Sequence, residues 1–361
     1  MGKKILITTP DTSMLGGVAA FYKNLNLETY PNVDYFFIQH NSDRSFRLKK
    51  IFIYPAKFIL FFWKCTQITT VVINPSFERN SILRDALYLL IAKKIFRRRT
   101  IIFWHGWAED FEEKVKRSAI YTFILQKYFG TADQTIILSN VFKIKLKSLG
   151  YSTNHNFYLS SVAADDSFIH SFPIQEKYTD MKIIKLLFLS RIISKKGIFR
   201  AIEMIHQLVN NKGIKNIRLF VAGDGDDVAE AKKMVTDMQL QEYIQFLGFI
   251  KDYEKDRILF DSHILLFPTS YYEGMPVSIL EAMLFGLYIL TSPRGGIIDI
   301  ISESNGILID ENDCDGYVNK IAELLNNTQR IKKVGFYNHI YSSENYTSSI
   351  VKEKLYTIFS N

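Results

Sequence analysis

The sequence of 361 residues contains only two cysteines, and this scarcity limits the chemistry that it can support. Cys65 and Cys314 lie far apart and match neither a disulfide framework nor the paired spacing of a zinc site. A reducing compartment is therefore the expected environment. The first residues, "MGKKILITTP", also lack the apolar core and the small-residue cleavage site of a secretory signal.

Long hydrophobic runs are missing as well. The longest, "IFIYPAKFILFFW" at residues 51–63, is interrupted by Lys57 and is too short to span a bilayer. The sequence shows no repeat at solenoid periods and no low-complexity tract. With 47% hydrophobic and 23% charged residues it has the composition of an ordinary globular protein. We expect a cytoplasmic location.

The net charge of +8 is unevenly distributed along the chain. Residues 1–165 contain 23 Lys and Arg against 12 Asp and Glu, which gives +11. The remaining residues contain 22 against 25, which gives −3. This asymmetry favours two domains with different partners, although a solvated basic face would produce the same count.

Short buried strands alternate with helical stretches, for example helices around 80–96 and 110–129. This alternation predicts an α/β protein with parallel sheets covered by helices on both faces. Ligands of such sheets gather at the carboxyl ends of the strands. The predicted strands cover residues 3–8, 33–38, 69–74, 100–105 and 134–139, then 183–190, 217–223, 243–249, 263–268 and 287–292.

We expect two doubly wound, Rossmann-like domains that face each other across a cleft, because the strand pattern restarts midway and the chain is long for one core. The polar stretch "DDSFIHSFPIQEKYTD" (165–180) is the expected connection. The predicted limits are a first domain at 1–165, a linker at 166–182, a second domain at 183–340, and a terminal helix at 341–361 packing back on the first domain.

Two features follow strands of the first half. Gly16 and Gly17 precede a helix, where glycine lets backbone N–H groups approach an anion. The segment does not match G-x-G-x-x-G, and a plain turn explains it equally well. His105, in "WHGW", ends the fourth strand and could hydrogen-bond a substrate or serve as a structural imidazole.

The second half has a stronger cluster. "FLSRIISKKGIFRAIEMI" places Arg191 just after a strand, and Lys195, Lys196 and Gly197 just before a helix. Two cations and free helix-end amides suit a diphosphate, with Arg as a planar fork and Lys as a point charge. A solvated basic loop is the alternative.

Two carboxylates lie eight positions apart in "YYEGMPVSILEAMLFG" (271–286). Pro276 suits the first helical turn, so Glu273 is expected in the preceding loop and Glu281 within the helix, on a stripe with Val277 and Leu284. A carboxylate in that position needs hydrogen-bond donors, which the hydroxyls of a ribose could supply. A glutamate that reaches water at the edge of the stripe is the alternative.

The last segment resembles the E-x7-E motif of glycosyltransferase family 4, the retaining nucleotide-sugar enzymes of the GT-B fold. "GGVAAFYKNL", "FLSRIISKKGI", "VAGDGDD", "IQFLGFI" and "PRGGIIDIISESNGILI" match that family in the same order. The resemblance implies transfer of a sugar from a nucleotide-sugar donor, with UDP-sugars favoured and GDP-sugars left open. A GT-B epimerase or hydrolase and a catalytically silent binding subunit are the alternatives.

The resemblance also implies roles for individual residues. Arg191 and Lys196 would hold the donor diphosphate and neutralise the leaving group, which fixed positive charge can do without a metal. His105 and Glu273 would contact the transferred sugar. The remaining donor-binding positions would be Gly16, Gly17, Gly274, Met275, Val277 and Glu281, with Glu281 on the ribose. No metal and no other cofactor is expected, although "GDGDD" around residues 224–226 leaves a manganese site open.

Two departures from the family pattern are visible. "LSSVAADDSF" stands where Asn-Gly-Val-Asp is usual, and Gly286-Leu287-Tyr288 stands where Gly-x-Pro is usual. In this fold the first domain meets the acceptor, and here that domain is basic, with "RSFRLKKIFIYPAKFILFFWK" (44–64) and "LLIAKKIFRRR" (89–99). We therefore expect a lipid-linked saccharide acceptor in bacterial surface-polysaccharide synthesis, peripheral attachment to the inner face of an anionic membrane, and no nucleic-acid partner.

Overall fold

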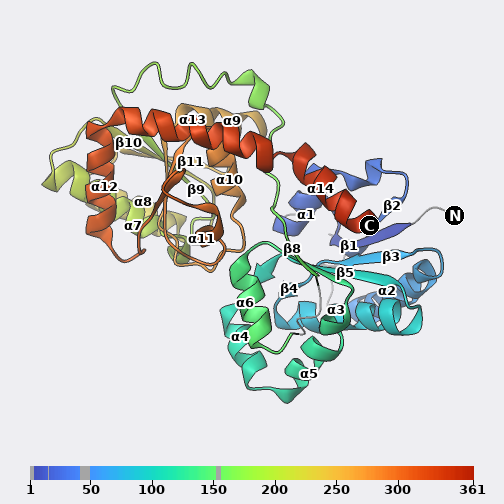
Figure 1. The fold of residues 1–361 in the computed structure, drawn as a ribbon. Coiled ribbons are helices and arrows are strands. Elements are labelled where there is room, and N and C mark those ends of the chain that lie inside the picture. The colour runs from blue at the N-terminus through green and yellow to red at the C-terminus, as the bar shows by residue number, and fades with distance from the viewer. Residues whose placement is uncertain (1–3, 15, 41–48, 152–155) are drawn as a thin grey trace. The chain divides into compact units, whose positions relative to one another are not determined.

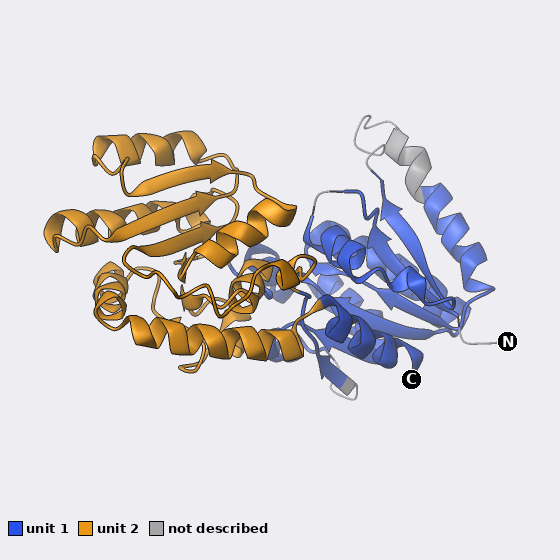
Figure 2. Ribbon diagram, turned by 90° about the horizontal axis from the view of Figure 1, so that it is seen from above, with its two compact units in different colours: residues 1–163, 272–275, 348–361 blue, residues 164–271, 276–347 orange. Residues whose placement is uncertain are grey.

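The computed structural model describes residues 4–14, 16–40, 49–151 and 156–361, and side chains at 49–54 and 156 are not described. The chain divides into two compact units (Figure 2). Unit 1 comprises Met1–Ala163, Tyr272–Met275 and Ser348–Asn361, and unit 2 comprises Ala164–Tyr271 and Pro276–Thr347. Residues 44–48 of the predicted basic stretch lie outside the described residues.

Unit 1 is built on a six-stranded parallel sheet with the order β2-β1-β3-β5-β7-β8 (Figure 1). The order reverses between β1 and β3, which is where doubly wound sheets bind ligands. The strands β4 and β6, which follow β3 and β5 along the chain, pair as a separate two-stranded parallel sheet. The strands are β1 (Ile5–Pro10), β2 (Val33–Gln39), β3 (Thr70–Ile73), β4 (Ser76–Phe77), β5 (Arg99–Trp104), β6 (Gly106–Trp107), β7 (Gln134–Ile137) and β8 (Asn156–Leu159).

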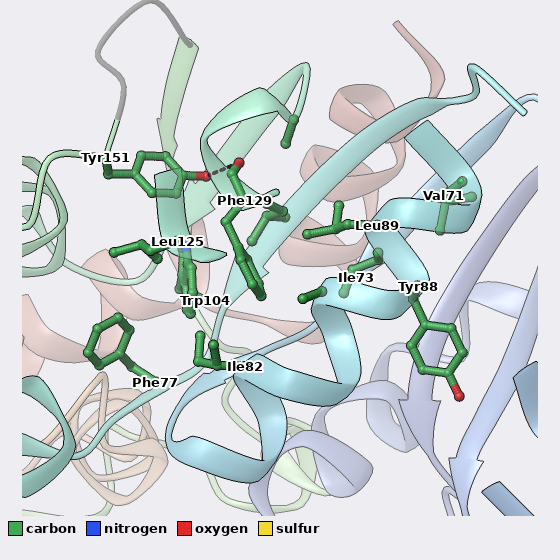
Figure 3. Packing of buried hydrophobic residues seen from close by; sticks show 14 of the residues in the cluster. Val71, Ile73, Phe77, Ile82, Tyr88, Leu89, Trp104, Leu125, Phe129 and Tyr151 are labelled. Carbon is green, nitrogen blue, oxygen red and sulfur yellow. Dashed lines mark hydrogen bonds between the residues drawn. The ribbon is translucent and has the colours of Figure 1, made fainter. Parts of the chain in front are cut away.

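Helices cover both faces of this sheet, with α1 and α14 on one side and α2, α3 and α5 on the other (Figure 1). Figure 3 shows how Phe77, Trp104 and Phe129 pack in the core between the sheet and the second group. The helices are α1 (Gly17–Leu25), η1 (Leu27–Thr29), α2 (Lys49–Cys65), α3 (Arg79–Leu89), the π-helix η3 (Leu90–Ile95), α4 (Glu109–Lys116), α5 (Ala119–Lys127), η4 (Phe129–Thr131), α6 (Asn140–Ser148) and α14 (Ser348–Ser360).

Unit 2 has its own six-stranded parallel sheet, with the order β11-β10-β9-β12-β13-β14. In order of appearance this is 3-2-1-4-5-6, the arrangement of dinucleotide-binding folds, and it reverses between β9 and β12. The strands are β9 (Ile184–Leu189), β10 (Ile217–Ala222), β11 (Ile244–Gly248), β12 (Ile264–Phe267), β13 (Tyr288–Thr291) and β14 (Gly306–Leu308). The helices are η5 (Ile169–Ser171), η6 (Ser194–Lys196), α7 (Ile198–His206), η7 (Gln207–Asn211), α8 (Val228–Asp237), α9 (Asp252–Asp261), α10 (Val277–Leu284), α11 (Ile297–Ile300), α12 (Cys314–Asn326) and α13 (Thr328–Asn345).

All ten predicted strands are present, and the α/β class with two Rossmann-like parallel sheets is confirmed. The short strands β4, β6, β8 and β14 were not predicted. The helical stretch predicted at 110–129 is divided into α4 and α5, because the backbone of Ser118 is extended between them.

The segment predicted as a linker packs against unit 2. Phe172, Ile174 and Tyr178 are buried, and Lys177 donates hydrogen bonds from Nζ to the carbonyl oxygens of Leu259 (2.8 Å) and Phe260 (2.6 Å). Lys177 thus satisfies carbonyl groups at the end of α9, as basic side chains can do at helix carboxyl termini. This segment is therefore an ordered part of unit 2, although its sequence is mostly polar.

The last helix, α14, belongs to unit 1. Arg99 on β5 donates to the carbonyl oxygens of Ile358 and Phe359, at 2.9 and 2.6 Å. Tyr356 stacks on Tyr30 with ring centroids 3.7 Å apart. The final residues thus complete the unit formed by the first half of the chain. Within the described residues, the structure shows no helix that combines the length and the hydropathy needed to cross a bilayer.

Candidate active site

The loop after β9 holds two of the predicted cations around one aromatic ring. Lys196 is buried, with 8% of its surface exposed, and its Nζ lies 4.3 Å from the centroid of the Tyr271 ring. Arg191 is exposed, and its guanidinium carbon lies 5.9 Å from the same centroid. Tyr271 therefore orients both cations at the carboxyl edge of the sheet through cation–π contacts.

The loops that follow the adjacent strands β9 and β12 are hydrogen-bonded to each other. The carbonyl oxygen of Lys195 accepts the backbone N–H groups of Ser270 (2.9 Å) and Tyr271 (3.0 Å). Gly197 has a φ of +91°, and a Cβ there would lie 2.1 Å from the carbonyl oxygen of Pro268. Only glycine therefore permits this approach, which starts α7 at the point where the sheet order reverses.

The "GDGDD" loop after β10 is hydrogen-bonded to the loop after β9 that carries Arg191 and Lys196. Asp227 accepts the backbone N–H of Ser194 at 2.5 Å, and Asp224 accepts that of Gly225 at 2.8 Å. A Cβ on Gly225 would lie 2.4 Å from the carbonyl oxygen of Ile192. These carboxylates thus have structural partners, and the described residues contain no cluster of three His, Cys, Asp or Glu that could hold a metal.

Glu281 lies on α10 with 6% of its surface exposed, and it is paired within unit 2. Lys255, on α9, donates from Nζ to Oε1 of Glu281 at 2.7 Å and to Oδ2 of Asp165 at 3.0 Å. The predicted apolar stripe was too narrow, since Ile279 to Leu284 are all buried while Val277 is 37% exposed. Pro276 is the residue that precedes the helix rather than its first residue.

The charged groups of this cluster change one another's pKa values. Burial raises the pKa of Glu281, although Lys255 opposes the rise. Burial would lower the pKa of Lys255, but Glu281 and Asp165 outweigh it and raise the pKa above its usual value. Lys255 therefore remains charged and supplies the donor that a buried carboxylate requires.

Asp256, next to Lys255 on α9, is fully buried. Nζ of Lys255 lies 4.0 Å from its Oδ1, and the backbone amide of Phe168 also favours the ionised form. Burial raises its pKa to about 7, with Lys255 opposing and Asp165 and Glu281 adding to the rise. Asp256 is therefore the carboxyl group of this cluster whose pKa lies near neutral pH.

In unit 1, Gly17 is the first residue of α1 and Gly16 precedes it with a φ of +151°. A Cβ built on either glycine meets nothing within 4 Å. The conformation of Gly16 explains why glycine stands there. At Gly17 the packing of the described residues gives no reason for a glycine.

His105 follows β5 and is fixed by a polar network. Its Nε2 lies 2.8 Å from Oδ1 of Asn74, which also accepts the hydroxyl of Tyr22 at 2.7 Å. Nδ2 of Asn74 donates to the carbonyl oxygen of Thr8, so Oδ1 must be the acceptor and Nε2 of His105 must carry the proton. Burial lowers the pKa of His105 to about 3, so the ring is neutral at pH 7 and its Nδ1 is an acceptor.

Glu273 to Met275 belong to unit 1, together with Tyr272. Tyr272 packs on Phe142, and Nζ of Lys145 lies 3.9 Å from the Tyr272 ring centroid. A Cβ on Gly274 would lie 3.0 Å from the carbonyl oxygen of His105, so this glycine and the histidine are neighbours. Glu273 itself is buried, with 7% of its surface exposed.

The structure thus brings the predicted residues together in three groups. Arg191 and Lys196 surround Tyr271, and Glu281 lies with Lys255 and Asp165 in the same unit. His105 adjoins the segment that carries Glu273, Gly274 and Met275. Sequence reasoning missed Lys255 and Asn74, because neither lies in a recognisable motif, and it noted the segment that contains Asp165 only as a departure from the family pattern.

Comparison with known proteins identifies the class. Residues 172–338 match the family model described as "Glycosyl transferases group 1". This part of the chain is thus similar to the group 1 glycosyltransferases, and the chain as a whole has the GT-B fold. The finer assignment to family 4 stays a prediction.

Two curated relatives come from Escherichia coli. A putative colanic acid biosynthesis glycosyltransferase, WcaL, is 25% identical over 208 residues, covering 56% of this chain and 50% of its own. A UDP-Gal:α-D-GlcNAc-diphosphoundecaprenol α-1,3-galactosyltransferase is 29% identical over 160 residues, covering 43% and 41%. The chain thus matches about half the length of WcaL and a smaller share of the galactosyltransferase.

Among solved structures, Anabaena HepE in complex with UDP has a TM-score of 0.75 and 14% identity, with 99% of both chains covered. The same protein in complex with UDP-glucose gives a TM-score of 0.74, also at 14% identity and 99% coverage of both chains. At this identity the likeness shows the fold.

Proposed function

We propose that this protein is a glycosyltransferase that moves a sugar from a nucleotide-sugar donor to a saccharide acceptor, with retention of configuration. The observation that carries the proposal is the pair of cations, Arg191 and Lys196, held around Tyr271 where the order of the unit 2 sheet reverses. This is the position where doubly wound folds bind nucleotides. The match of this unit to group 1 glycosyltransferases supports the same reading.

The two cations would act on the donor diphosphate. Glycosyl transfer breaks the bond between the sugar and the diphosphate, so negative charge develops on the departing oxygen. A buried Lys196 is pre-oriented for that charge and needs little reorganisation, which is how fixed charges lower a barrier. Arg191, more exposed, would supply a planar fork for phosphate oxygens. No metal is needed in this scheme.

The carboxylates would position the two sugars. Glu281, anchored by Lys255, would accept hydroxyl groups of the ribose, and Glu273 would accept hydroxyl groups of the transferred sugar. His105 is neutral with Nδ1 as an acceptor, so it would receive a hydrogen bond from a sugar hydroxyl rather than donate one. Gly16 and Gly17, with Gly274, Met275 and Val277, would offer backbone amides to the donor.

The donor we favour is a UDP-sugar, with a GDP-sugar as the alternative. The solved structures of HepE contain UDP and UDP-glucose, and the Escherichia coli galactosyltransferase carries UDP-Gal in its name. That relative also acts on a sugar linked to diphosphoundecaprenol, and WcaL is named for colanic acid biosynthesis. A lipid-linked saccharide acceptor in surface-polysaccharide synthesis, reached by a protein attached peripherally to the cytoplasmic face of a membrane, fits these relatives and the basic unit 1.

A ligand screen followed by a transfer assay tests the proposal. The protein is heated with UDP, GDP, ADP and dTDP and with the corresponding nucleotide sugars, and a bound ligand raises its unfolding temperature. The best donor is then incubated with and without lipid-linked saccharides, and the anomeric configuration of the product is read by NMR. We expect stabilisation by UDP and transfer that needs an acceptor. No response to any nucleotide would contradict the proposal, and turnover without an acceptor would favour the epimerase or hydrolase.

A further inference from the structure

Unit 1 exposes large apolar side chains on neighbouring helices. α2 contacts η3, which continues α3, and α3 contacts α5. Figure 1 shows α2, α3 and α5 on the side of the sheet opposite α1 and α14. We call these exposed side chains the apolar helical face: Ile59, Leu60, Phe62, Trp63, Leu83, Leu87, Ile95, Ile120 and Phe123.

The helix α2 is apolar on its outer side as well as its inner side. Phe61 and Cys65 are fully buried in the core, whereas Ile59 and Trp63 are 64% and 66% exposed. Ile59 and Trp63 are four residues apart and so share one side of the helix. An amphipathic surface helix normally turns charged side chains to water, and contiguous exposed apolar surface marks a binding face.

The segment that carries most of this face is basic in sequence, although Lys64, Lys93 and Arg84 are paired with aspartates and Arg99 bonds to α14. Residues 57–99 contain only two acidic residues, Glu78 and Asp85. Lys94 and Arg97 are exposed on either side of Ile95, which is itself 53% exposed. The nine Lys and Arg of the segment are Lys57, Lys64, Arg79, Arg84, Lys93, Lys94, Arg97, Arg98 and Arg99.

Tryptophan and other aromatic residues beside lysine and arginine are typical of surfaces at the boundary between lipid and water. A second copy of the chain is a poorer occupant. In a symmetric dimer through this face, the same patch meets itself, which would bring the two basic segments together. An anionic surface neutralises those charges and also accepts the apolar side chains.

We propose that the apolar helical face docks unit 1 on the headgroup layer of an anionic lipid membrane. Trp63, Ile59 and the neighbouring apolar side chains enter the boundary between headgroups and acyl chains. Lys94 and Arg97 contact lipid phosphates. The proposal rests on the proposed function only for its purpose, which is to reach a lipid-linked acceptor, since attachment itself requires neither donor nor acceptor.

The three tryptophans make the test direct. Trp104 and Trp107 are buried, at 0% and 6% exposure, so Trp63 is the one whose fluorescence reports on the surface. The full chain is mixed with vesicles of phosphatidylglycerol or of phosphatidylcholine. We expect a blue shift of the emission and co-sedimentation with phosphatidylglycerol, both weakened by added salt, and neither with phosphatidylcholine. Trp63→Phe should lose the blue shift and keep most of the binding.

Variants locate the surface. Ile59→Ser/Trp63→Ser and Lys94→Glu/Arg97→Glu should each lower partitioning onto phosphatidylglycerol vesicles by about tenfold or more. The matched controls lie in unit 2: Ile340→Ser, which removes a side chain that is 57% exposed on α13, and Lys212→Glu/Lys215→Glu, which reverses two exposed lysines. Both controls should bind vesicles like the wild type. The thermal unfolding transition, measured on every variant, reports whether the fold is intact.

Three results would overturn the proposal. One is the absence of binding to either vesicle, and another is equal binding to both. The third is self-association of the chain, abolished by Ile59→Ser/Trp63→Ser, without vesicle binding, which would assign the face to a second copy. None of these results depends on sugar transfer, so a failure of the docking proposal is distinguishable from a failure of the glycosyltransferase assignment. Vesicle binding without nucleotide binding would support the docking proposal and contradict the proposed function.

Discussion

Lys255 on α9 donates a hydrogen bond of 2.7 Å to Glu281 on α10, and the two side chains are 14% and 8% exposed. The same amine lies 3.0 Å from the carboxylate of Asp165. A buried carboxylate without a counter-charge is costly, so Lys255 fixes both the charge and the orientation of Glu281. The residue proposed to bind the ribose is therefore part of a network that extends to the start of unit 2.

Replacing Lys255 by methionine should destabilise unit 2. The change keeps most of the side-chain volume but leaves the buried Glu281 and the half-buried Asp165 without their counter-charge, at a cost of about 3–5 kcal/mol for a buried pair broken on one side. We expect a lower unfolding temperature and weaker UDP binding. Lys251→Met is the matched control, since that lysine is 75% exposed. Lys255→Met/Glu281→Gln should recover part of the stability, and equal stability of Lys255→Met and Lys251→Met would contradict this account.

The cations of the loop after β9 can be separated by truncation. Lys196→Ala should weaken UDP binding by about 1.5–3 kcal/mol, or roughly 10- to 100-fold, because it removes a charge-assisted contact from a desolvated position. Arg191→Ala should have a smaller effect on binding, since an exposed charge is screened. Calorimetric titration with UDP measures both.

Lys195→Ala is the control for these variants. The side chain of Lys195 is exposed, and the structural role of the residue is carried by its carbonyl oxygen, which the substitution retains. Its UDP affinity should match the wild type. The diphosphate assignment would have to be abandoned if Lys196→Ala and Arg191→Ala also bound UDP normally.

The two glutamates should respond differently to nucleotide and to sugar. Glu281→Gln should weaken binding of free UDP, because its carboxylate is proposed to hold the ribose. Glu273→Gln should leave UDP affinity nearly unchanged and lower kcat, because its proposed partner is the transferred sugar. Titration with UDP and steady-state kinetics with the donor separate the two. Identical behaviour of the two variants toward UDP would refute this division of roles.

The strands and the order of the motifs could be predicted because both are local. Buried strands such as Ile184–Leu189 are short apolar runs, Arg191 and Lys196 follow that strand closely, and Glu281 lies eight positions after Glu273. The partners of Glu281 could not be predicted, since Lys255 is 26 positions away on a polar helix and Asp165 lies 90 positions from Lys255. Such long-range pairs depend on how α9 and α10 pack, which local patterns do not encode.

The segment at residues 165–180 also makes contacts that its local sequence does not predict. The polar composition of residues 165–180 predicted a linker but did not indicate that Phe172, Ile174 and Tyr178 are buried within unit 2. The hydroxyl of Tyr178 donates to the carbonyl oxygen of Gly286, directly after α10. Gly286 has a φ of +72°, as is usual for a glycine that ends a helix, and it is the glycine of the Gly-x-Pro pattern that this chain keeps.

Transfer should continue after divalent metals are removed. The proposed mechanism neutralises the leaving group with Lys196 and Arg191, so a metal would be redundant there. We expect donor turnover in excess EDTA to equal that of the untreated protein, with the untreated rate unchanged by added Mn²⁺. Complete loss of activity in EDTA, with recovery on adding Mn²⁺, would show that a metal acts in the reaction.

Asp256 should make the stability of unit 2 depend on pH. Its pKa is raised from the usual 3.8 to about 7 in the folded protein, first by burial. Between those two values the folded chain holds a proton that the unfolded chain has released, so stability falls as the pH rises through this window. Below it both states are protonated and the penalty vanishes, whereas above it both are ionised and the penalty is complete.

Asp256→Asn isolates this contribution, because it replaces the carboxylate by a neutral group of nearly the same shape. The variant should be more stable than the wild type at about pH 8, and the difference should shrink steadily toward about pH 4. Buried histidines such as His105 and His263, which titrate in both proteins, cancel in the comparison. Chemical denaturation of the two proteins across this range measures the difference. If it stayed constant with pH, the titrating group would not be Asp256, and the proton held by the cluster would have to be reassigned to Glu281.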